Sequence, residues 1–167
     1  MSDPYGFPTS DAAHVIATAL EEDLGPLSLD VTTMATIPAA QRSRAVVVAR
    51  APGVVAGVPA IAQTLNAVAV RLGWEPVEVE PVAVDGQRVV RGDVLATLNG
   101  PTRTILVAER TLLNILSRTS GVATHTRRWA DELVGTSCTV LDTRKTTPGL
   151  RALEKYAVRC GGGTNKR

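Results

Sequence analysis

A short polar segment near the C-terminal end of the sequence combines residue types that bind small anions. Asp142, Thr143, Arg144 and Lys145 follow the apolar run Thr-Val-Leu, which has the composition of a buried strand. Arginine offers a planar fork of donors that binds a carboxylate or phosphate with two hydrogen bonds, whereas lysine supplies a compact point charge. Because α/β folds place ligands at the carboxyl ends of strands, Arg144 and Lys145 are candidate anion-binding residues. The alternative is that both are solvated loop charges.

A run of three glycines at 161–163 is followed by Asn165, Lys166 and Arg167. Consecutive glycines can let backbone N–H groups approach an anion, and the two cations would add charge to such a site. The alternative is an ordinary helix end, which glycine favours. The run has neither the GxxxxGK[ST] pattern of a P-loop nor the GxGxxG pattern of a dinucleotide fold, so it matches neither of these motifs.

Arg110 lies within a long helical pattern, directly after Glu109 and one turn before Asn114. In one interpretation Arg110 projects from a rigid helix toward an anionic ligand. In the other, Glu109 and Arg110 form an ion pair or take part in helix packing. Both interpretations remain open from the residues alone.

The N-terminal segment predicts one amphipathic helix and then a loop. The helix is capped by Ser10 and Asp11 and ends at the Gly-Pro pair 25–26. The acidic residues 21–23 lie at its C-terminal end, where the helix dipole disfavours negative charge. We therefore expect either a solvated helix end or basic neighbours from another element. Residues 28–38 show little periodicity and are expected to form a loop.

The middle of the chain predicts short strands over 43–98, with one helix at 58–70. An Asp-Gly pair at 85–86 between apolar runs predicts a β-hairpin. The segment 86–100 is similar to the barrel-sandwich domains of biotinyl and lipoyl carriers. Residues 41–100 contain no lysine, which excludes a carrier with a swinging lysine arm.

From residue 102 the pattern changes to a helix over 102–133, a strand over 136–143 and a helix opened by Pro148. Gly121 inside the long helix predicts a kink or close packing at that point. This helix–strand–helix order is typical of an α/β architecture.

The composition favours small anions as ligands. Residues 1–40 contain six acidic residues and no Lys or Arg, whereas residues 100–167 contain twelve basic and five acidic residues. Aromatic residues make up 3% of the chain, too few for stacking on single-stranded nucleic acid, so no nucleic-acid partner is expected. No apolar run could span a bilayer and no secretion signal is visible, so we expect a cytoplasmic protein without a membrane partner. Structural rather than metal-binding roles are expected for His14, His125, Cys138 and Cys160.

Three stretches together resemble the quinolinate phosphoribosyltransferases, also called nicotinate-nucleotide pyrophosphorylases (carboxylating). They are ALEEDLGPLSLDVTT at 19–33, GDVLATLNGPTRTILVAERTLLNILSRTSGVAT at 92–124 and VLDTRKTTPGLRALEKYAVRCGGGTN at 140–165. With this resemblance, the expected fold is an α+β N-terminal domain over 1–104, followed by the start of an incomplete α/β barrel over 105–167. The first domain is expected to be β-rich and barrel-sandwich-like, with helices.

The resemblance implies transfer of a phosphoribosyl group from phosphoribosyl pyrophosphate to quinolinate, releasing CO₂ and pyrophosphate. The product is nicotinate mononucleotide for NAD biosynthesis, and Mg²⁺ is the implied cofactor, although its acidic ligands are not expected in this chain. The matching positions imply that Arg144, Lys145 and Arg167 line the substrate site. Lys166 adds a cation where the family usually has histidine. Arg110 is implied to cross a homodimer interface into the neighbouring site.

The sequence ends where the family continues with a further lysine, acidic residues and glycine-rich phosphate loops. We therefore expect a fragment or truncated product with little or no activity, and we assign no catalytic residue. Two alternatives stay open. One is a non-catalytic remnant that dimerises or binds anions. The other is a related nicotinate phosphoribosyltransferase or molybdenum-transport-associated protein.

Overall fold

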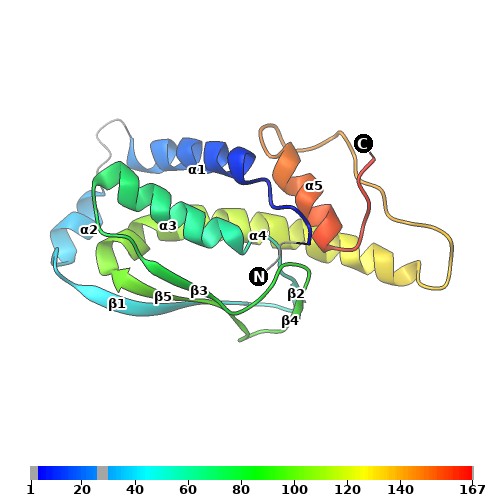
Figure 1. The fold of residues 1–167 in the computed structure, drawn as a ribbon, viewed down its shortest axis with the longest axis horizontal. Coiled ribbons are helices and arrows are strands. Elements are labelled where there is room, and N and C mark those ends of the chain that lie inside the picture. Colours follow the sequence, from blue (N-terminus) through cyan, green and yellow to red (C-terminus); the bar gives the residue numbers. More distant parts are fainter. Residues whose placement is uncertain (1–3, 26–29, 167) are drawn as a thin grey trace.

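The computed structural model describes residues 4–25 and 30–166, which combine helices with two small antiparallel sheets (Figure 1). A three-stranded sheet forms one layer, α3 and α4 cover one of its faces, and α1 and α5 lie beyond these helices. In chain order the elements are α1 (Thr9–Leu24), α2 (Val31–Thr36), β1 (Arg42–Val48), β2 (Gly53–Val54), α3 (Pro59–Leu72), β3 (Glu78–Pro81), β4 (Arg88–Val89), β5 (Val94–Pro101), α4 (Thr102–Glu132) and α5 (Arg151–Cys160).

The larger sheet has the strand order β1-β5-β3, and β2 and β4 form the second sheet. In the larger sheet Ala45 of β1 lies opposite Leu98 of β5, and the register shifts after Val47. Because successive side chains of a strand point to opposite faces, Val47 is buried under the helices while Val46 is exposed on the open face.

The long helix α4 is the central element of the core. It contacts α3, α5, β2 and β5, and its buried residues include Leu112 and Ile115. These residues belong to one apolar cluster with Ile16 of α1 and Leu65 of α3. The amphipathic periodicity of α4 therefore places one continuous apolar stripe against three other helices and the sheet.

Hydroxyl groups of α4 bind the backbone of the segment that contains β2. Thr119 Oγ1 donates to the Ala56 carbonyl at 2.5 Å, and Thr124 Oγ1 accepts from the Val54 N–H at 2.9 Å. The approach is close enough that a Cβ on Gly53 would lie 2.6 Å from Thr124 Oγ1. Glycine at this position therefore lets the two backbones meet.

The structure confirms the three longest predicted helices. They are α1, which ends at the predicted Gly25, α3 over 59–72 and α4 over 102–132. Pro26, the second predicted helix stop, lies outside the described residues. None of the helices in the described part of the chain has the length and apolarity that a membrane crossing needs.

Several local predictions are wrong in the N-terminal half. The expected loop contains α2, whose first turn is capped by Asp30 through a 3.0 Å hydrogen bond from the Thr33 N–H. No side chain caps α1, which begins after Pro8. The Asp-Gly pair at 85–86 does not join paired strands, since β3 pairs with β5 and β4 with β2. The Gly86 N–H instead donates to the Val55 carbonyl at 2.8 Å.

Two predicted elements of the C-terminal half also differ from the structure. The expected strand over 136–143 is reduced to one isolated bridge residue, Leu141, because it finds only Thr164 as a partner in the described chain. The last helix begins at Arg151 rather than at Pro148. Of the two alternatives predicted at Gly121, close packing is absent, since a Cβ there would meet no described atom within 4 Å, and the kink stays a prediction.

Candidate functional site

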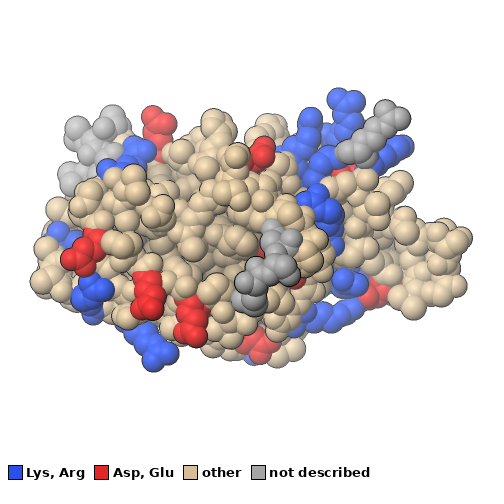
Figure 2. Space-filling view, in the orientation of Figure 1, with Lys and Arg blue, Asp and Glu red and all other residues tan. Residues whose placement is uncertain are grey.

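Two cationic segments that are distant in sequence lie side by side at the end of the molecule that carries α5. Leu141 and Thr164 form a parallel β-bridge, and the Asp142 N–H donates to the Thr164 carbonyl at 3.0 Å. The loop 143–147 therefore starts beside the segment 164–166. Figure 2 shows Lys and Arg side chains gathered at this end of the molecule.

Three of the predicted site residues meet here. Arg144, Lys145 and Lys166 are exposed, and none of their side chains makes a hydrogen bond or ion pair to another residue in the described part of the chain. Their charges are thus available to an anionic ligand. Arg167, the fourth predicted residue of this group, lies outside the described residues.

The carboxylate of Asp142 does not face solvent beside these cations but is held by α5. Its side chain is 3% exposed, and Oδ2 forms an ion pair with Lys155 Nζ at 2.6 Å. Oδ1 accepts from the Lys166 N–H at 2.9 Å. Burial alone would raise the pKa of Asp142, but the Lys155 ammonium and the Lys166 N–H outweigh it and lower the pKa. Asp142 is therefore a structural anion that joins the two cationic segments.

A second ion pair holds the far end of the same loop. Glu154 of α5 accepts from Arg118 Nη2 of α4 at 2.5 Å and from the Thr147 N–H at 3.2 Å. Arg118 Nη2 also donates to Thr147 Oγ1 at 2.8 Å. Burial opposes ionisation of Glu154, yet the hydrogen bonds from Arg118 and Thr147 bring its pKa below the ordinary value.

Sequence reasoning missed these supporting residues. Glu154, Lys155 and Arg118 were each readable as surface charges of amphipathic helices, because no local spacing connects them to the loop. The one available signal was the pair Glu154-Lys155 next to Leu153 and Tyr156, which the structure buries. Charged residues between buried ones need partners, which predicts nearby opposite charges but does not identify them.

The glycine run ends α5 and offers no anion cradle. All three N–H groups of residues 161–163 donate to carbonyls of α5, at Ala157, Arg159 and Val158. A Cβ on Gly161 would lie 2.5 Å from the Ala123 carbonyl of α4. Of the two interpretations from sequence, the structure thus favours the helix end, because these donors are already used and the glycines serve close packing.

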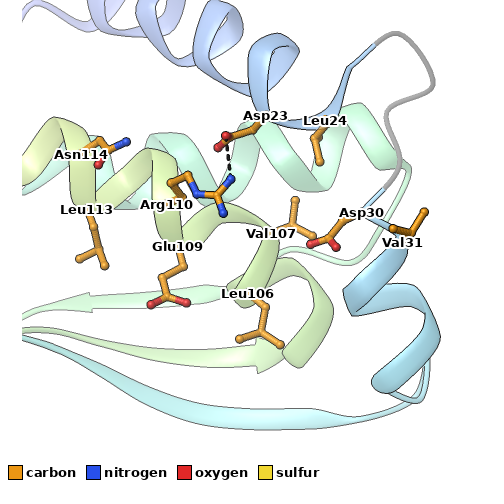
Figure 3. Close-up of a pocket in the computed structure, with 10 residues that line it drawn as sticks. All are labelled: Asp23, Leu24, Asp30, Val31, Leu106, Val107, Glu109, Arg110, Leu113 and Asn114. Atoms are coloured by element: carbon orange, nitrogen blue, oxygen red, sulfur yellow. Dashed lines mark hydrogen bonds and ion pairs between the residues drawn. The ribbon is translucent and has the colours of Figure 1, made fainter.

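Arg110 lies in a different pocket, near the other end of α4 (Figure 3). Its Nη1 forms an ion pair with Asp23 Oδ1 at 3.0 Å, and the Arg110 side chain is 73% exposed. The hydrogen bond that Arg110 donates to the Asp23 carboxylate raises the pKa of Arg110. The 570 Å³ pocket contains no residue of the 140–166 region, so within this chain the structure does not bring Arg110 together with the cationic loop.

Acidic residues dominate the polar lining of that pocket. Asp23, Asp30 and Glu109 line it with Arg110 and Asn114. Backbone N–H donation from Thr33 lowers the pKa of Asp30, which caps α2. Among the described residues of this lining Arg110 is the one cation, so these residues by themselves do not form an anion site.

An apolar groove runs beside the cationic loop. It has a volume of 710 Å³ and its walls include Val122, Trp129 and Leu141 together with Asp142 and Thr143. Trp129 is 59% exposed, and its indole N–H donates to His125 Nε2 at 3.2 Å. His125 thus has a hydrogen-bond partner on its own helix. The groove gives a flat ligand an apolar surface next to exposed cations.

The described residues do not fit a protein-held magnesium ion. No three His, Cys, Asp or Glu side chains in 4–25 and 30–166 lie close enough together to hold a metal. Two carboxylates lie beside the cationic loop in the described part of the chain, and both are already paired, Asp142 with Lys155 and Glu154 with Arg118.

Two family models match consecutive parts of the chain. The model described as quinolinate phosphoribosyl transferase, N-terminal domain, matches residues 30–120, and its C-terminal domain counterpart matches residues 122–167. The boundary at residue 121 lies inside α4. The domain division at 104–105 expected from the sequence stays a prediction.

Individual proteins agree with these matches. A nicotinate-nucleotide pyrophosphorylase (carboxylating) of Mycobacterium leprae is 46% identical over 158 residues, 94% of this chain and 54% of the relative. The chloroplastic enzyme of that name from Arabidopsis thaliana is 42% identical, with 98% of this chain and 45% of the relative covered. The chain spans about half the length of the curated relatives it matches.

Solved structures show the same similarity in three dimensions. The nicotinate-nucleotide pyrophosphorylase from Francisella tularensis superposes with a TM-score of 0.84 at 30% identity, covering 100% of this chain and 57% of that one. NadC from Streptococcus pyogenes gives a TM-score of 0.83 at 34% identity, covering 92% and 53%. Sequence and fold lead to one conclusion: the chain belongs to the quinolinate phosphoribosyl transferase family.

Proposed function

We propose that this chain serves the transfer of a phosphoribosyl group from phosphoribosyl pyrophosphate to quinolinate, with release of CO₂ and pyrophosphate. The product would be nicotinate mononucleotide, a precursor in NAD biosynthesis. The observation that carries the proposal is that Arg144, Lys145 and Lys166 lie exposed on two adjoining segments, with side chains that have no partner among the described residues. The family membership supplies the chemistry that such a surface would serve.

The geometry suits the charges of both substrates. Quinolinate is a dicarboxylate and the donor carries a phosphate and a pyrophosphate, so several fixed cations are needed. The fork of Arg144 can bind one carboxylate with two hydrogen bonds, and Lys145 and Lys166 add point charges. As the ribosyl centre becomes oxocarbenium-like, fixed cations stabilise the charge that develops on the leaving pyrophosphate.

Arg110 belongs to this proposal through a second copy of the chain. It is exposed on α4 and lies in a separate pocket from the cationic loop, so its contribution to an anion site requires a neighbouring protomer. We therefore keep the homodimer as part of the proposal. A dimer in solution would be detected by sedimentation or light scattering, and a monomer at every concentration would contradict this part.

The proposal also includes the architecture and the location expected from the sequence. The expected architecture is a barrel-sandwich-like part followed by the start of an α/β barrel, and the expected location is the cytoplasm. Mg²⁺ would arrive with the substrate, since this ion binds phosphate oxygens and keeps several waters rather than requiring an all-protein cage.

Binding of quinolinate to the purified 167-residue chain tests the proposal. We expect saturable binding in calorimetry, weaker binding of nicotinate, and a dissociation constant for quinolinate that rises about tenfold in Arg144→Gln. Arg91→Gln is the matched control, because Arg91 is an exposed arginine outside both pockets. Absence of quinolinate binding, or equal effects of the two substitutions, would contradict the proposal.

Turnover is a separate measurement on the same protein. We expect little or no nicotinate mononucleotide from quinolinate, phosphoribosyl pyrophosphate and Mg²⁺ with this chain. Quinolinate binding without turnover would favour the non-catalytic alternative, in which the chain binds anions or dimerises. Turnover comparable to that of an enzyme of the family would contradict our expectation of lost activity.

A further inference from the structure

The cationic loop 143–147 is held at both ends by two adjacent residues of α5. We propose that Glu154 and Lys155 are positioning residues that fix the backbone on either side of Arg144 and Lys145, and so set their geometry toward an anionic substrate. The inference rests on the proposed function, because it concerns the same anion site.

Lys155 holds the start of the loop. Its ammonium lies 2.6 Å from Oδ2 of Asp142, the residue directly before Thr143, and only 18% of the Lys155 side chain is exposed. Asp142 is tied a second time through its backbone, whose N–H donates to the Thr164 carbonyl at 3.0 Å. The chain therefore enters the loop from a fixed point.

Glu154 holds the end of the loop. One carboxylate oxygen accepts from Arg118 of α4, while the other accepts from the Thr147 N–H at 3.2 Å. The Thr147 carbonyl in turn accepts from the Leu150 N–H at 3.0 Å. The loop thus leaves toward α5 from a second fixed point.

The contacts of Lys155 and Glu154 with the loop act together because both residues lie on one packed helix, α5. Successive residues of a helix point in directions about 100° apart, so Glu154 and Lys155 reach opposite ends of one short loop. Tyr156, Ala157 and Cys160 are fully buried on the same helix. A rigid helix that holds both ends restricts the free loop, which lowers the cost of ordering its cations when a ligand binds.

The direction in which anion binding changes when Glu154 is neutralised distinguishes a positioning role from a purely electrostatic one. Glu154 is an acid close to a cationic loop, so removing its negative charge would strengthen anion binding if only Coulomb forces acted. If Glu154 positions the loop, the same change weakens anion binding. Glutamine keeps the size of Glu154, but its single carbonyl oxygen cannot accept from both Arg118 and the Thr147 N–H, because its NH₂ group would face the other donor.

The experiment uses the 167-residue chain with inorganic pyrophosphate and quinolinate as probes. Glu154→Gln should raise both dissociation constants about fivefold and speed amide hydrogen exchange in 143–147 about tenfold. Thr147→Val, which removes an acceptor of Arg118 without changing charge, should raise the constants about twofold. Glu80→Gln, an exposed site on β3, is the charge-matched control and should change neither quantity.

The outcomes separate this inference from the proposed function. Faster exchange in 143–147 together with weaker probe binding in Glu154→Gln supports the positioning role. Unchanged exchange, or tighter probe binding, overturns it. If the unsubstituted chain binds neither probe, the proposed function fails. The amide exchange rates of residues 143–147 then show by themselves whether Glu154 restrains the loop. Thermal unfolding of each variant shows whether it is folded, and Thr147→Val supplies the test if Glu154→Gln is not.

Discussion

Asp23, at the C-terminal end of α1, holds the guanidinium of Arg110 on α4 through a 3.0 Å ion pair. Thr111 supports the same carboxylate, with its hydroxyl 3.4 Å from Oδ2. The sequence predicts that an acid at this helix end needs either solvent or a basic neighbour, and the structure identifies the neighbour. The ion pair therefore joins the first helix to the long one and fixes the direction of an exposed arginine.

Replacing Asp23 should loosen this connection only slightly. Asp23→Asn keeps the shape but removes the charge, so we expect a fall in melting temperature of about 1–3 °C, since exposed ion pairs contribute little. The difference from the unsubstituted chain should shrink at high salt, because counterions screen exposed charges. A large loss that salt does not change would mean that Asp23 acts through packing instead.

Replacing Lys155 should be far more damaging than replacing an exposed lysine. Lys155→Met leaves the buried Asp142 carboxylate without its cation, at a cost of about 3 kcal/mol in the free energy of unfolding. Urea unfolding measures this loss, with Lys145→Met as the exposed control. The double variant Asp142→Asn/Lys155→Met should recover most of the stability, because no unpaired charge remains. If the losses in unfolding free energy of the two single variants simply add up in the double variant, Asp142 and Lys155 are not coupled.

Acid should destabilise the fold through two carboxylates. The pKa values of Asp142 and Glu154 are lowered from the ordinary 3.8 and 4.5. Their contribution is therefore fully present above those ordinary values and is lost as the pH falls through them toward the lowered folded values. Urea unfolding at a series of pH values should show this decline, and a shallower one in Glu154→Gln. Equal slopes in both proteins would show that Glu154 is not involved.

Gly161, directly after α5, and Gly121, within α4, should respond oppositely to alanine. Gly161→Ala would place a methyl group 2.5 Å from the Ala123 carbonyl, so we expect a loss of about 2 kcal/mol in unfolding free energy. Gly121→Ala meets no described atom within 4 Å and improves helix propensity, so we expect a gain of about 0.5–1 kcal/mol. Denaturant unfolding of the two variants checks both signs, and a loss in Gly121→Ala would indicate a hidden contact.

Tyr156 should remain un-ionised in alkaline solution as long as the protein is folded. Burial, followed by the hydrogen bond to Asp85, raises its pKa. A titration of phenolate absorbance should therefore show no signal from Tyr156 before unfolding. Tyr156→Phe should cost about 1.5–3 kcal/mol, because it removes a hydrogen bond to a charged group. Phenolate absorbance from Tyr156 in the folded state would contradict this account.

Periodicity predicted the long helices because burial of one face follows directly from the spacing of apolar residues. It failed where a long-range partner decided the structure. Asp85 and Gly86 have the composition of a hairpin turn, but Asp85 binds Tyr156 and Val58 instead of linking two paired strands. The apolar run before Asp142 has the composition of a strand, but only Thr164 pairs with it in the described chain.

The candidate site was predictable only in part, because a local sequence pattern does not show which distant residues come together. Arg144 and Lys145 could be chosen from residue type and position, because they directly follow an apolar run. Lys166 could be chosen from its place after the glycine run and from the family resemblance. Glu154 and Arg118, which hold the loop, could not be chosen, since 36 residues separate them. Helix packing brings them together, and no local pattern in the sequence records it.

The boundary between the two family models falls at Gly121, in the middle of the continuous helix α4. Arg110 and Arg118 lie on that helix about 12 Å apart along its axis, at 1.5 Å per residue. One continuous helix therefore connects the Arg110 pocket with the cationic loop. Because α4 is continuous between the two arginines, a tilt of the helix at Arg110 is accompanied by a tilt at Arg118, which binds Glu154 and Thr147 at the end of the cationic loop. No glycine or proline interrupts residues 110–118, and Gly121 lies beyond Arg118, so the stretch between the two arginines holds no residue that favours a bend.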